Sequence, residues 1–326
     1  MLKSISTFLL ACGLAAPGIA ESPIGVQALT AGGGGDDPHH LSLSVWYPAQ
    51  DGGTPEDVGG NAVFVGHPAH RDAAMAPGHY PLVLLSHGGL RSAADSGAWL
   101  SGRLAHKGFI VAEVNAPRPD SAADAVNEIW RRPQAVSGAL DRILTDPAWS
   151  SAVDPSRIAV AGYALGGTSA LALAGGAINR DAFATTCAAD ANGPDCAWYA
   201  AQGVSLSSVD AEALERTHRD PRIGTAIAID PEYAETFVAQ SLIAPQADIV
   251  VIGLGARDDS LVPAADLPRV VIETATRFDA FPVCTEKGEF ILAEDGGDAT
   301  LCAAGKAERA RIHDEIAGRI GAILNR

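Results

Sequence analysis

Short hydrophobic runs alternate with stretches of helical spacing along most of this chain. Buried strands are expected at residues 82–85, 109–114, 158–161, 225–229, 249–253 and 270–274. Helical patterns at residues 94–107, 126–145, 168–175 and 307–324 separate or follow them. This alternation predicts an α/β fold, with a mostly parallel central sheet and helices on both of its faces.

Three other segments complete the predicted domain. Residues 41–47 alternate apolar with polar side chains, which predicts an edge strand, and the Gly/Pro-rich residues 48–81 predict a long surface loop. Residues 177–223 stand between a helix and the next strand and contain Trp198 and Tyr199, so we expect a small cap insertion there. We therefore predict one domain over residues 21–326.

The composition narrows the class of protein and its partners. The chain has 326 residues, 47% of them hydrophobic, which excludes a disordered chain. A formal charge of −16 disfavours nucleic acid and anionic membranes as partners.

The first 20 residues are a predicted signal peptide. They contain Lys3, an apolar run over residues 5–16 that is too short to span a bilayer, and small residues up to Ala20. The predicted location is periplasmic or secreted; the alternative is a lipoprotein anchored through Cys12.

Four cysteines follow the predicted leader, namely Cys187, Cys196, Cys284 and Cys302. An even number in an exported chain predicts two disulfides. Of the three pairings that four cysteines allow, the local ones (187–196 and 284–302) are the simplest, because they close short loops. A zinc site is the rival interpretation, but no C-x-x-C pair or nearby histidine supports it.

The most informative motif is a nucleophile elbow without its nucleophile. Residues 162–166 have the form G-x-S-x-G, between a predicted strand and a predicted helix, but Ala164 replaces the serine. In α/β-hydrolases this turn presents the serine hydroxyl above the sheet. The motif therefore predicts the α/β-hydrolase fold, and an alanine at this position cannot form an acyl-enzyme.

The remaining site positions are expected at the ends of neighbouring strands. His87-Gly88-Gly89 follows the strand at 82–85, so Gly88 and Leu165 are the predicted donors of an oxyanion hole. Asp259 follows the strand at 249–253 in the frame D-x-x-V-P and is the predicted triad acid, with the adjacent Asp258 as the alternative. No histidine follows the last strand until His313, which lies in the final helical pattern and is expected to be a surface or packing residue.

These motifs together resemble a known family. The chain is similar to the exported predicted dienelactone hydrolases of the platelet-activating-factor-acetylhydrolase type, which are α/β-hydrolases. The elbow, the Cys284/Cys302 pair and residues 45–48, 61–64, 81–87, 130–133, 153–158, 217–221 and 228–231 carry the resemblance. It implies a carboxylic ester hydrolase with Ser, Asp and His and without a metal. Against that pattern Arg277 occupies the histidine position, and the segment at 263–270 is short.

We therefore expect a degenerate hydrolase that binds a small ester-like or acyl ligand, without a cofactor, in a pocket lined by Leu90, Tyr163, Leu165 and cap aromatics. Losing either Ser or His from a triad removes nearly all of its activity. The alternative is an active ester or lactone hydrolase with a non-standard site. The histidines at 39, 40, 67 and 70 suggest a metal site, but they are expected to be solvated loop residues.

Overall fold

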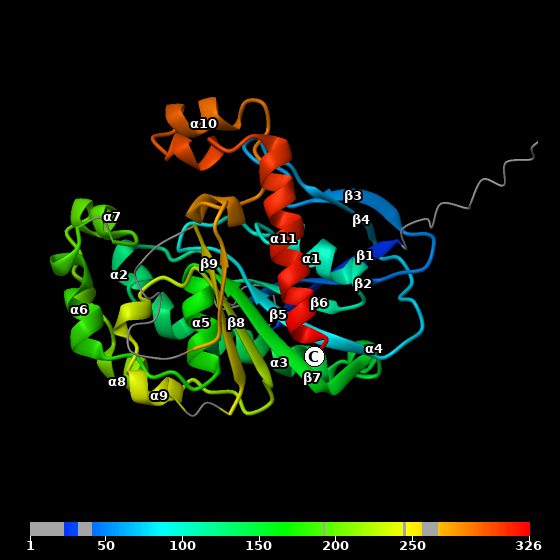
Figure 1. Cartoon of the computed structure of the whole chain (residues 1–326), viewed down its shortest axis with the longest axis horizontal. Helices are drawn as coiled ribbons and strands as arrows, with labels where there is room; N and C mark the ends of the chain where they lie inside the picture. The colour runs from blue at the N-terminus through cyan, green and yellow to red at the C-terminus, as the bar shows by residue number, and fades with distance from the viewer. Residues whose placement is uncertain (1–22, 32–40, 192, 244–245, 256–266) are drawn as a thin grey trace, which may run out of the picture.

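A mixed ten-stranded sheet forms the centre of the computed structural model, which describes residues 23–31, 41–191, 193–243, 246–255 and 267–326 (Figure 1). Within those residues the spatial order is β10-β9-β8-β7-β5-β6-β2-β1-β4-β3. The strands are β1 (Ile24–Ala31), β2 (Leu41–Pro48), β3 (Thr54–Val58), β4 (His67–Arg71), β5 (Tyr80–Ser86), β6 (Ile110–Asn115), β7 (Val153–Tyr163), β8 (Thr225–Ile229), β9 (Asp248–Leu254) and β10 (Arg269–Ile272).

The six strands from β5 to β10 are parallel to one another, and the predicted α/β class is confirmed. Most of these strands are covered on both faces, so they appear in the sequence as continuous apolar runs. Their carboxyl ends meet at one edge of the sheet, where α/β proteins place their sites.

The amino-terminal part of the sheet differs from the prediction. β2 is not an edge strand, because it pairs antiparallel with β6 on one side and with β1 on the other. The predicted loop at 48–81 contains β3 and β4, which form an antiparallel pair, and β4 also lies parallel to β1. Two of these pairings, β2 with β6 and β1 with β4, join segments far apart in sequence, so the local pattern of side chains does not reveal them.

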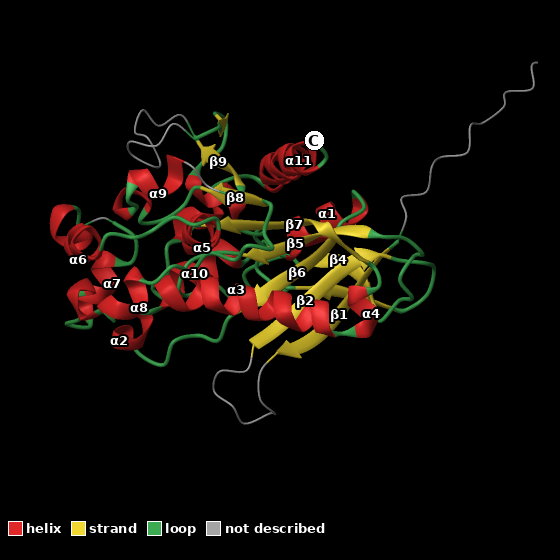
Figure 2. Ribbon diagram, turned by 90° about the horizontal axis from the view of Figure 1, so that it is seen from below, coloured by secondary structure: helices red, strands yellow, loops and turns green. Residues whose placement is uncertain are grey.

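Helices cover both faces of the sheet. The described helices are α1 (Ala98–His106), α2 (Ala122–Ala125), α3 (Glu128–Thr145), α4 (Pro147–Ser150), α5 (Leu165–Leu173), α6 (Arg180–Ala189), α7 (Cys196–Ala201), α8 (Ala211–Glu215), α9 (Ala239–Ile243), α10 (Gly288–Glu294) and α11 (Lys306–Leu324), with 3₁₀ turns η1 (Leu206–Ser208), η2 (Ala234–Thr236), η3 (Arg277–Ala280) and η4 (Ala299–Cys302). Figure 2 shows α1 and α11 on one side of the sheet and α3 on the other. Each side has its own apolar core, with Leu140 and Leu171 in one and Leu100 and Ile316 in the other.

The segment between α5 and β8 is built from the short helices α6, α7 and α8 with η1. Figure 1 shows these helices together beside the carboxyl ends of the strands. A disulfide between Cys187 and Cys196 joins α6 to α7. The hydroxyl of Tyr233, which follows β8, donates to the carbonyl of Pro194 at 2.9 Å and ties this segment to the sheet.

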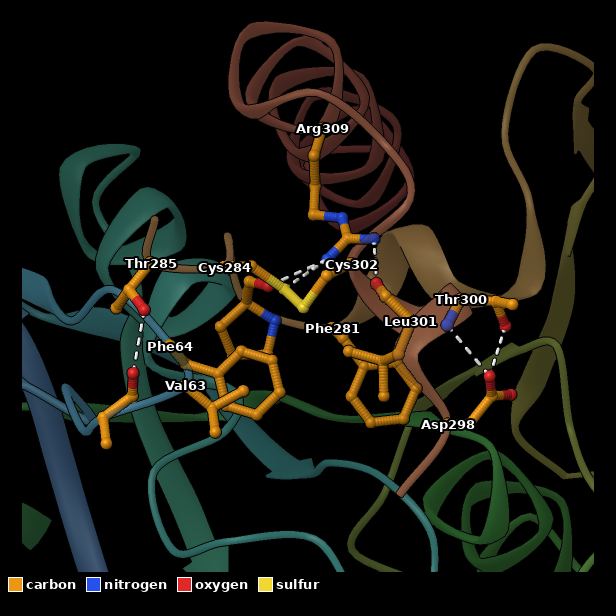
Figure 3. Close-up of a disulfide and its surroundings, with 12 residues drawn as sticks. Val63, Phe64, Phe281, Cys284, Thr285, Asp298, Thr300, Leu301, Cys302 and Arg309 are labelled. Atoms are coloured by element: carbon orange, nitrogen blue, oxygen red, sulfur yellow. Dashed lines mark hydrogen bonds between the residues drawn. A yellow bond between two sulfur atoms is a disulfide. The ribbon is translucent and has the colours of Figure 1, made fainter. Parts of the chain in front are cut away.

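The second disulfide, Cys284–Cys302, encloses α10 and η4 (Figure 3). Arg309 of α11 is almost fully buried beside it and donates to the carbonyls of Pro282 and Leu301. Both local cysteine pairings are therefore confirmed, and they suit an oxidising compartment. Among the described helices none is long and apolar enough to cross a membrane. The predicted signal peptide (residues 1–20) and Cys12 lie outside the described residues.

Candidate functional site

Ala164 lies at the apex of a sharp turn between β7 and α5. Its φ of 56° and ψ of −122° are rare for a residue with a side chain and cost about 1–3 kcal/mol. A Cβ on Gly162 would lie 2.0 Å from the carbonyl oxygen of Gly166, and one on Gly166 would lie 1.8 Å from that of Ser86. The two glycines of the motif are therefore required for the backbone to turn here, whatever occupies the apex.

The backbone at the apex is fixed by the neighbouring strand. The N–H of Ala164 donates to Ile229 of β8 at 3.1 Å, and the carbonyl of Ala164 accepts from the N–H of Glu232 at 3.2 Å. Ala164 is 5% exposed. The methyl group thus occupies the place where an α/β-hydrolase presents its nucleophile.

In the loop after β5, the predicted oxyanion donor Gly88 has its N–H already bound within the protein. The N–H of Gly88, which has a φ of 85°, donates to the carbonyl of Tyr163 at 3.1 Å, so it is engaged within the fold. For the next N–H, that of Gly89, no acceptor occurs among the described residues. Leu165 is the first residue of α5, and its N–H has no acceptor in a preceding helical turn. Among the described residues, the N–H groups of Gly89 and Leu165 are therefore the pair left for a ligand, and the oxyanion hole itself stays a prediction.

Arg132 of α3 binds the backbone carbonyls of the loop after β5. Its Nη1 donates to the carbonyl of Gly88 and its Nη2 to the carbonyl of Gly89, each at 2.8 Å. Its Nε lies 3.7 Å from Oε2 of Glu128, one helical turn earlier. Both side chains are about nine-tenths buried. Because both carbonyls are bound on the Arg132 side, the guanidinium sets the direction of the peptide planes at Gly88 and Gly89.

Neither histidine near the site can serve as a triad base. His87 donates from Nε2 to the carbonyl of Ala280 at 2.8 Å, its Nδ1 lies 3.2 Å from Oγ of Ser96, and burial lowers its pKa to about 4. His313 stacks on Trp99, with ring centroids 3.7 Å apart, and burial lowers its pKa to about 3. His313 is thus the packing residue that the sequence predicted.

Arg277 lies beside the elbow, at the start of η3. The Tyr163 hydroxyl donates to its backbone carbonyl, and its guanidinium carbon lies 5.8 Å from the ring centroid of Phe278. The positive charge of Arg277 lowers the pKa values of Glu232 and Asp195, against the larger effect of burial. Asp258 and Asp259 lie outside the described residues, so the triad-acid assignment stays a prediction.

Glu232 is a site residue that the sequence analysis missed. It follows β8, and its Oε1 lies 3.5 Å from the point that a Cβ on Gly89 would occupy. Its Oε2 is buried and has no hydrogen-bond partner among the described residues. Burial and the charge of Asp195 raise its pKa to about 7, although Arg132 and Arg277 oppose the shift. The sequence feature that could have identified Glu232 is its position directly after a predicted parallel strand, where α/β proteins place their site residues.

Asp195 is a further charged group near the elbow, and it lies in the segment that the sequence predicted as a cap. Its carboxylate lies 3.4 Å from Nη2 of Arg91, and Arg91 also lies 5.8 Å from the ring centroid of Trp198. Burial raises the pKa of Asp195. Among the described residues, three cations and three acids therefore lie around the elbow and residues 87–89, which we call the oxyanion loop after their predicted role. We call these six the charged cluster: Arg91, Arg132, Arg277, Glu128, Asp195 and Glu232.

The three residues named as the predicted pocket lining are buried in the apolar cores of the protein. Leu90 and Leu165 are core residues on the α3 and α5 side, and Tyr163 is a core residue on the other side. A pocket of about 630 Å³ lies at the same edge of the sheet, between the loop after β6 and α3, with Trp130 and Arg132 in its lining.

The predicted loop histidines lie partly in a strand. His67 and His70 belong to β4, and burial lowers the pKa of His67 to about 4. The described residues contain no group of three or more His, Cys, Asp or Glu side chains arranged to hold a metal ion. His39 and His40 lie outside the described residues.

Comparison with known proteins supports the fold. No protein-family model and no curated protein matches the chain. Among solved structures it is similar to a ferulic acid esterase from Streptomyces cinnamoneus, with 20% sequence identity, a TM-score of 0.59, and 95% of this chain and 91% of that chain covered. The chain therefore has an α/β-hydrolase fold. The likeness at this identity concerns the fold alone, so the dienelactone hydrolase resemblance stays a prediction.

Proposed function

We propose that this protein is an exported, esterase-derived binding protein that holds a small ester-like or acyl ligand at the elbow and forms no acyl-enzyme. The observation that carries the proposal is the methyl group of Ala164 at the apex of an otherwise complete elbow. Covalent ester hydrolysis on this fold needs an oxygen at that point, and a methyl group cannot supply one.

The surroundings of Ala164 support the same proposal. Arg277 stands where the resemblance places the triad histidine, and a guanidinium is always protonated, so it cannot accept a proton as a general base. His87 and His313 are engaged elsewhere. Leu165 and Gly89 nevertheless offer N–H groups that suit a ligand carbonyl.

Covalent labelling tests the loss of the acyl-enzyme. We expect intact-mass spectrometry to detect no adduct when the protein is treated with a fluorophosphonate, whereas the variant Ala164→Ser/Arg277→His gains one. Ala164→Ser alone is the matched control for the missing base and is expected to react more slowly. An adduct on the wild-type protein would overturn the proposal.

Ligand binding needs a separate measurement with a probe that cannot be hydrolysed. We would use 4-nitrophenylacetone, in which a methylene replaces the ester oxygen, and measure binding by calorimetry. We expect saturable binding that Ala164→Leu abolishes, because the larger side chain fills the space above the turn. Absence of saturable binding by the wild-type protein would refute the binding role.

A further inference from the structure

Glu232 offers the elbow a base that the missing triad no longer provides. Its backbone N–H is bound to the carbonyl of Ala164, so the residue is fixed to the turn itself. Its carboxylate faces Gly89 of the oxyanion loop, and Oε2 is buried without a hydrogen-bond partner among the described residues. A buried acceptor of this kind requires a donor, and a water is small enough to be one.

We propose that Glu232 holds and deprotonates a water that attacks the carbonyl of the bound ligand directly, so that the protein slowly hydrolyses acyl compounds with a good leaving group, such as aryl esters. This inference rests on the proposed ligand site at the elbow. It adds a chemical step to that site, and the step involves no covalent intermediate with the protein.

The step balances without a co-reactant. The Glu232 carboxylate takes one proton from the water while the water oxygen forms a bond to the acyl carbon. The carbonyl electron pair moves to its oxygen, which accepts from the N–H groups of Leu165 and Gly89. The bond to the leaving oxygen then breaks, and Glu232 returns the proton to it. The products are a carboxylic acid and an alcohol or phenol.

The electrostatics of the charged cluster favour this order of events. A second negative charge beside an ionised Glu232 would be strongly repelled. In the proposed step Glu232 becomes neutral as the oxyanion forms, so the net charge of the site does not change. Arg132 and Arg277 act on Glu232 through their positive charge, and the same charge favours the oxyanion without a direct contact.

The pKa of Glu232 also suits the role of a general base that its position indicates. A carboxylate of ordinary pKa is a weak base at neutral pH, and a general base works best when its pKa lies near the working pH. Burial raises the pKa of Glu232 to about 7. The described groups that act on this carboxylate are Asp195, Asp230, Arg132 and Arg277, with the hydroxyls of Tyr199 and Tyr233 nearby.

The test is hydrolysis of p-nitrophenyl acetate by the wild-type protein, Glu232→Gln and Glu235→Gln. Glu235 is an exposed acid on the same loop, outside the charged cluster, and serves as the matched control. We expect slow wild-type turnover without a burst, unaffected by fluorophosphonate, and unchanged in Glu235→Gln. Glu232→Gln should lower the rate about 10²–10⁴-fold. Equal rates for Glu232→Gln and Glu235→Gln would overturn the inference.

Two further readouts separate a chemical role from a structural one. The wild-type rate should rise with pH through about 7 and then level off, because the base is the ionised form. Asp195→Asn should shift that profile to lower pH, since Asp195 raises the pKa of Glu232. A profile that does not respond to Asp195→Asn would count against the inference. So would wild-type turnover equal to buffer while 4-nitrophenylacetone still binds, a result that leaves the binding function intact.

Discussion

Replacing Arg132 by methionine should destabilise the whole domain, although the residue lies at the edge of the sheet. The change keeps an unbranched side chain and removes the two hydrogen bonds to Gly88 and Gly89. Hydrogen bonds to a charged group contribute about 1.5–3 kcal/mol each. The substitution also leaves the buried Glu128 without the cation that lies 3.7 Å from it.

These contributions are not additive, because Glu128 can respond by taking up a proton. Burial already raises its pKa, and Arg132 is the largest opposing influence, so removing Arg132 raises that pKa further. Breaking a buried pair by removing one partner costs about 3–5 kcal/mol. We expect a loss in that range at pH 8 and a smaller loss at pH 5, where Glu128 is more readily protonated.

Urea denaturation followed by circular dichroism measures this loss. The matched control is Arg131→Met at the neighbouring residue. The side chain of Arg131 is 38% exposed, and its Nη1 lies 3.8 Å from Oδ1 of Asp124 and 3.9 Å from Oε1 of Glu128. That exposed pairing should be worth less than about 1 kcal/mol. Glu128→Gln/Arg132→Met should recover part of the loss. Equal stabilities of Arg132→Met and Arg131→Met would refute the assigned role of Arg132.

Three further predictions concern stability. Replacing both Cys284 and Cys302 by serine should lower the free energy of unfolding by about 3 kcal/mol, because the bridge closes a loop with a sequence separation of 18. An unchanged urea midpoint would contradict this prediction. Burial raises the pKa of Glu113 from 4.5 to about 8, so the wild type should lose stability as the pH rises from about 4.5 to about 8. Glu113→Gln should lose less stability over this range, and parallel stability curves for the two proteins would exclude Glu113 as the source. Burial lowers the pKa of His67 to about 4, so its contribution to stability is present above pH 6.5 and lost on acidification. His67→Gln should therefore reduce the slope of unfolding free energy between pH 6 and 4.5 by about 1.4 kcal/mol per pH unit, and an unaltered slope would disprove the assignment.

The parallel half of the fold was predictable because each strand carries its own signal. β8 and β9 are buried apolar runs, and the elbow identifies the strand that precedes it. β2 was misread as an edge strand because of its serines, yet Ser44 is buried. A small polar side chain fits between neighbouring strands, so alternation does not mark an exposed face. β3 contains Pro55 and two acids, a composition that only an edge strand tolerates and that also suits a loop.

The charged cluster was not predictable for a different reason. Arg132 comes from α3, Asp195 from the segment between α6 and α7, Glu232 from the loop after β8, and Arg277 from η3. Each is an ordinary charged residue within its own stretch of sequence. Their pKa shifts arise from burial and from one another, and both appear only when four distant segments meet at one edge of the sheet.

The elbow shows why a motif can outlast the chemistry with which it is associated. Gly162 and Gly166 are fixed by close approaches to backbone oxygens, and the N–H and carbonyl of Ala164 are bound to Ile229 and Glu232. None of these constraints involves the side chain at the apex. A serine can therefore be lost there without loss of the turn, whereas either glycine cannot be replaced without moving β5 or α5. The two glycines thus report the fold, whereas the residue at the apex decides whether an acyl-enzyme can form there.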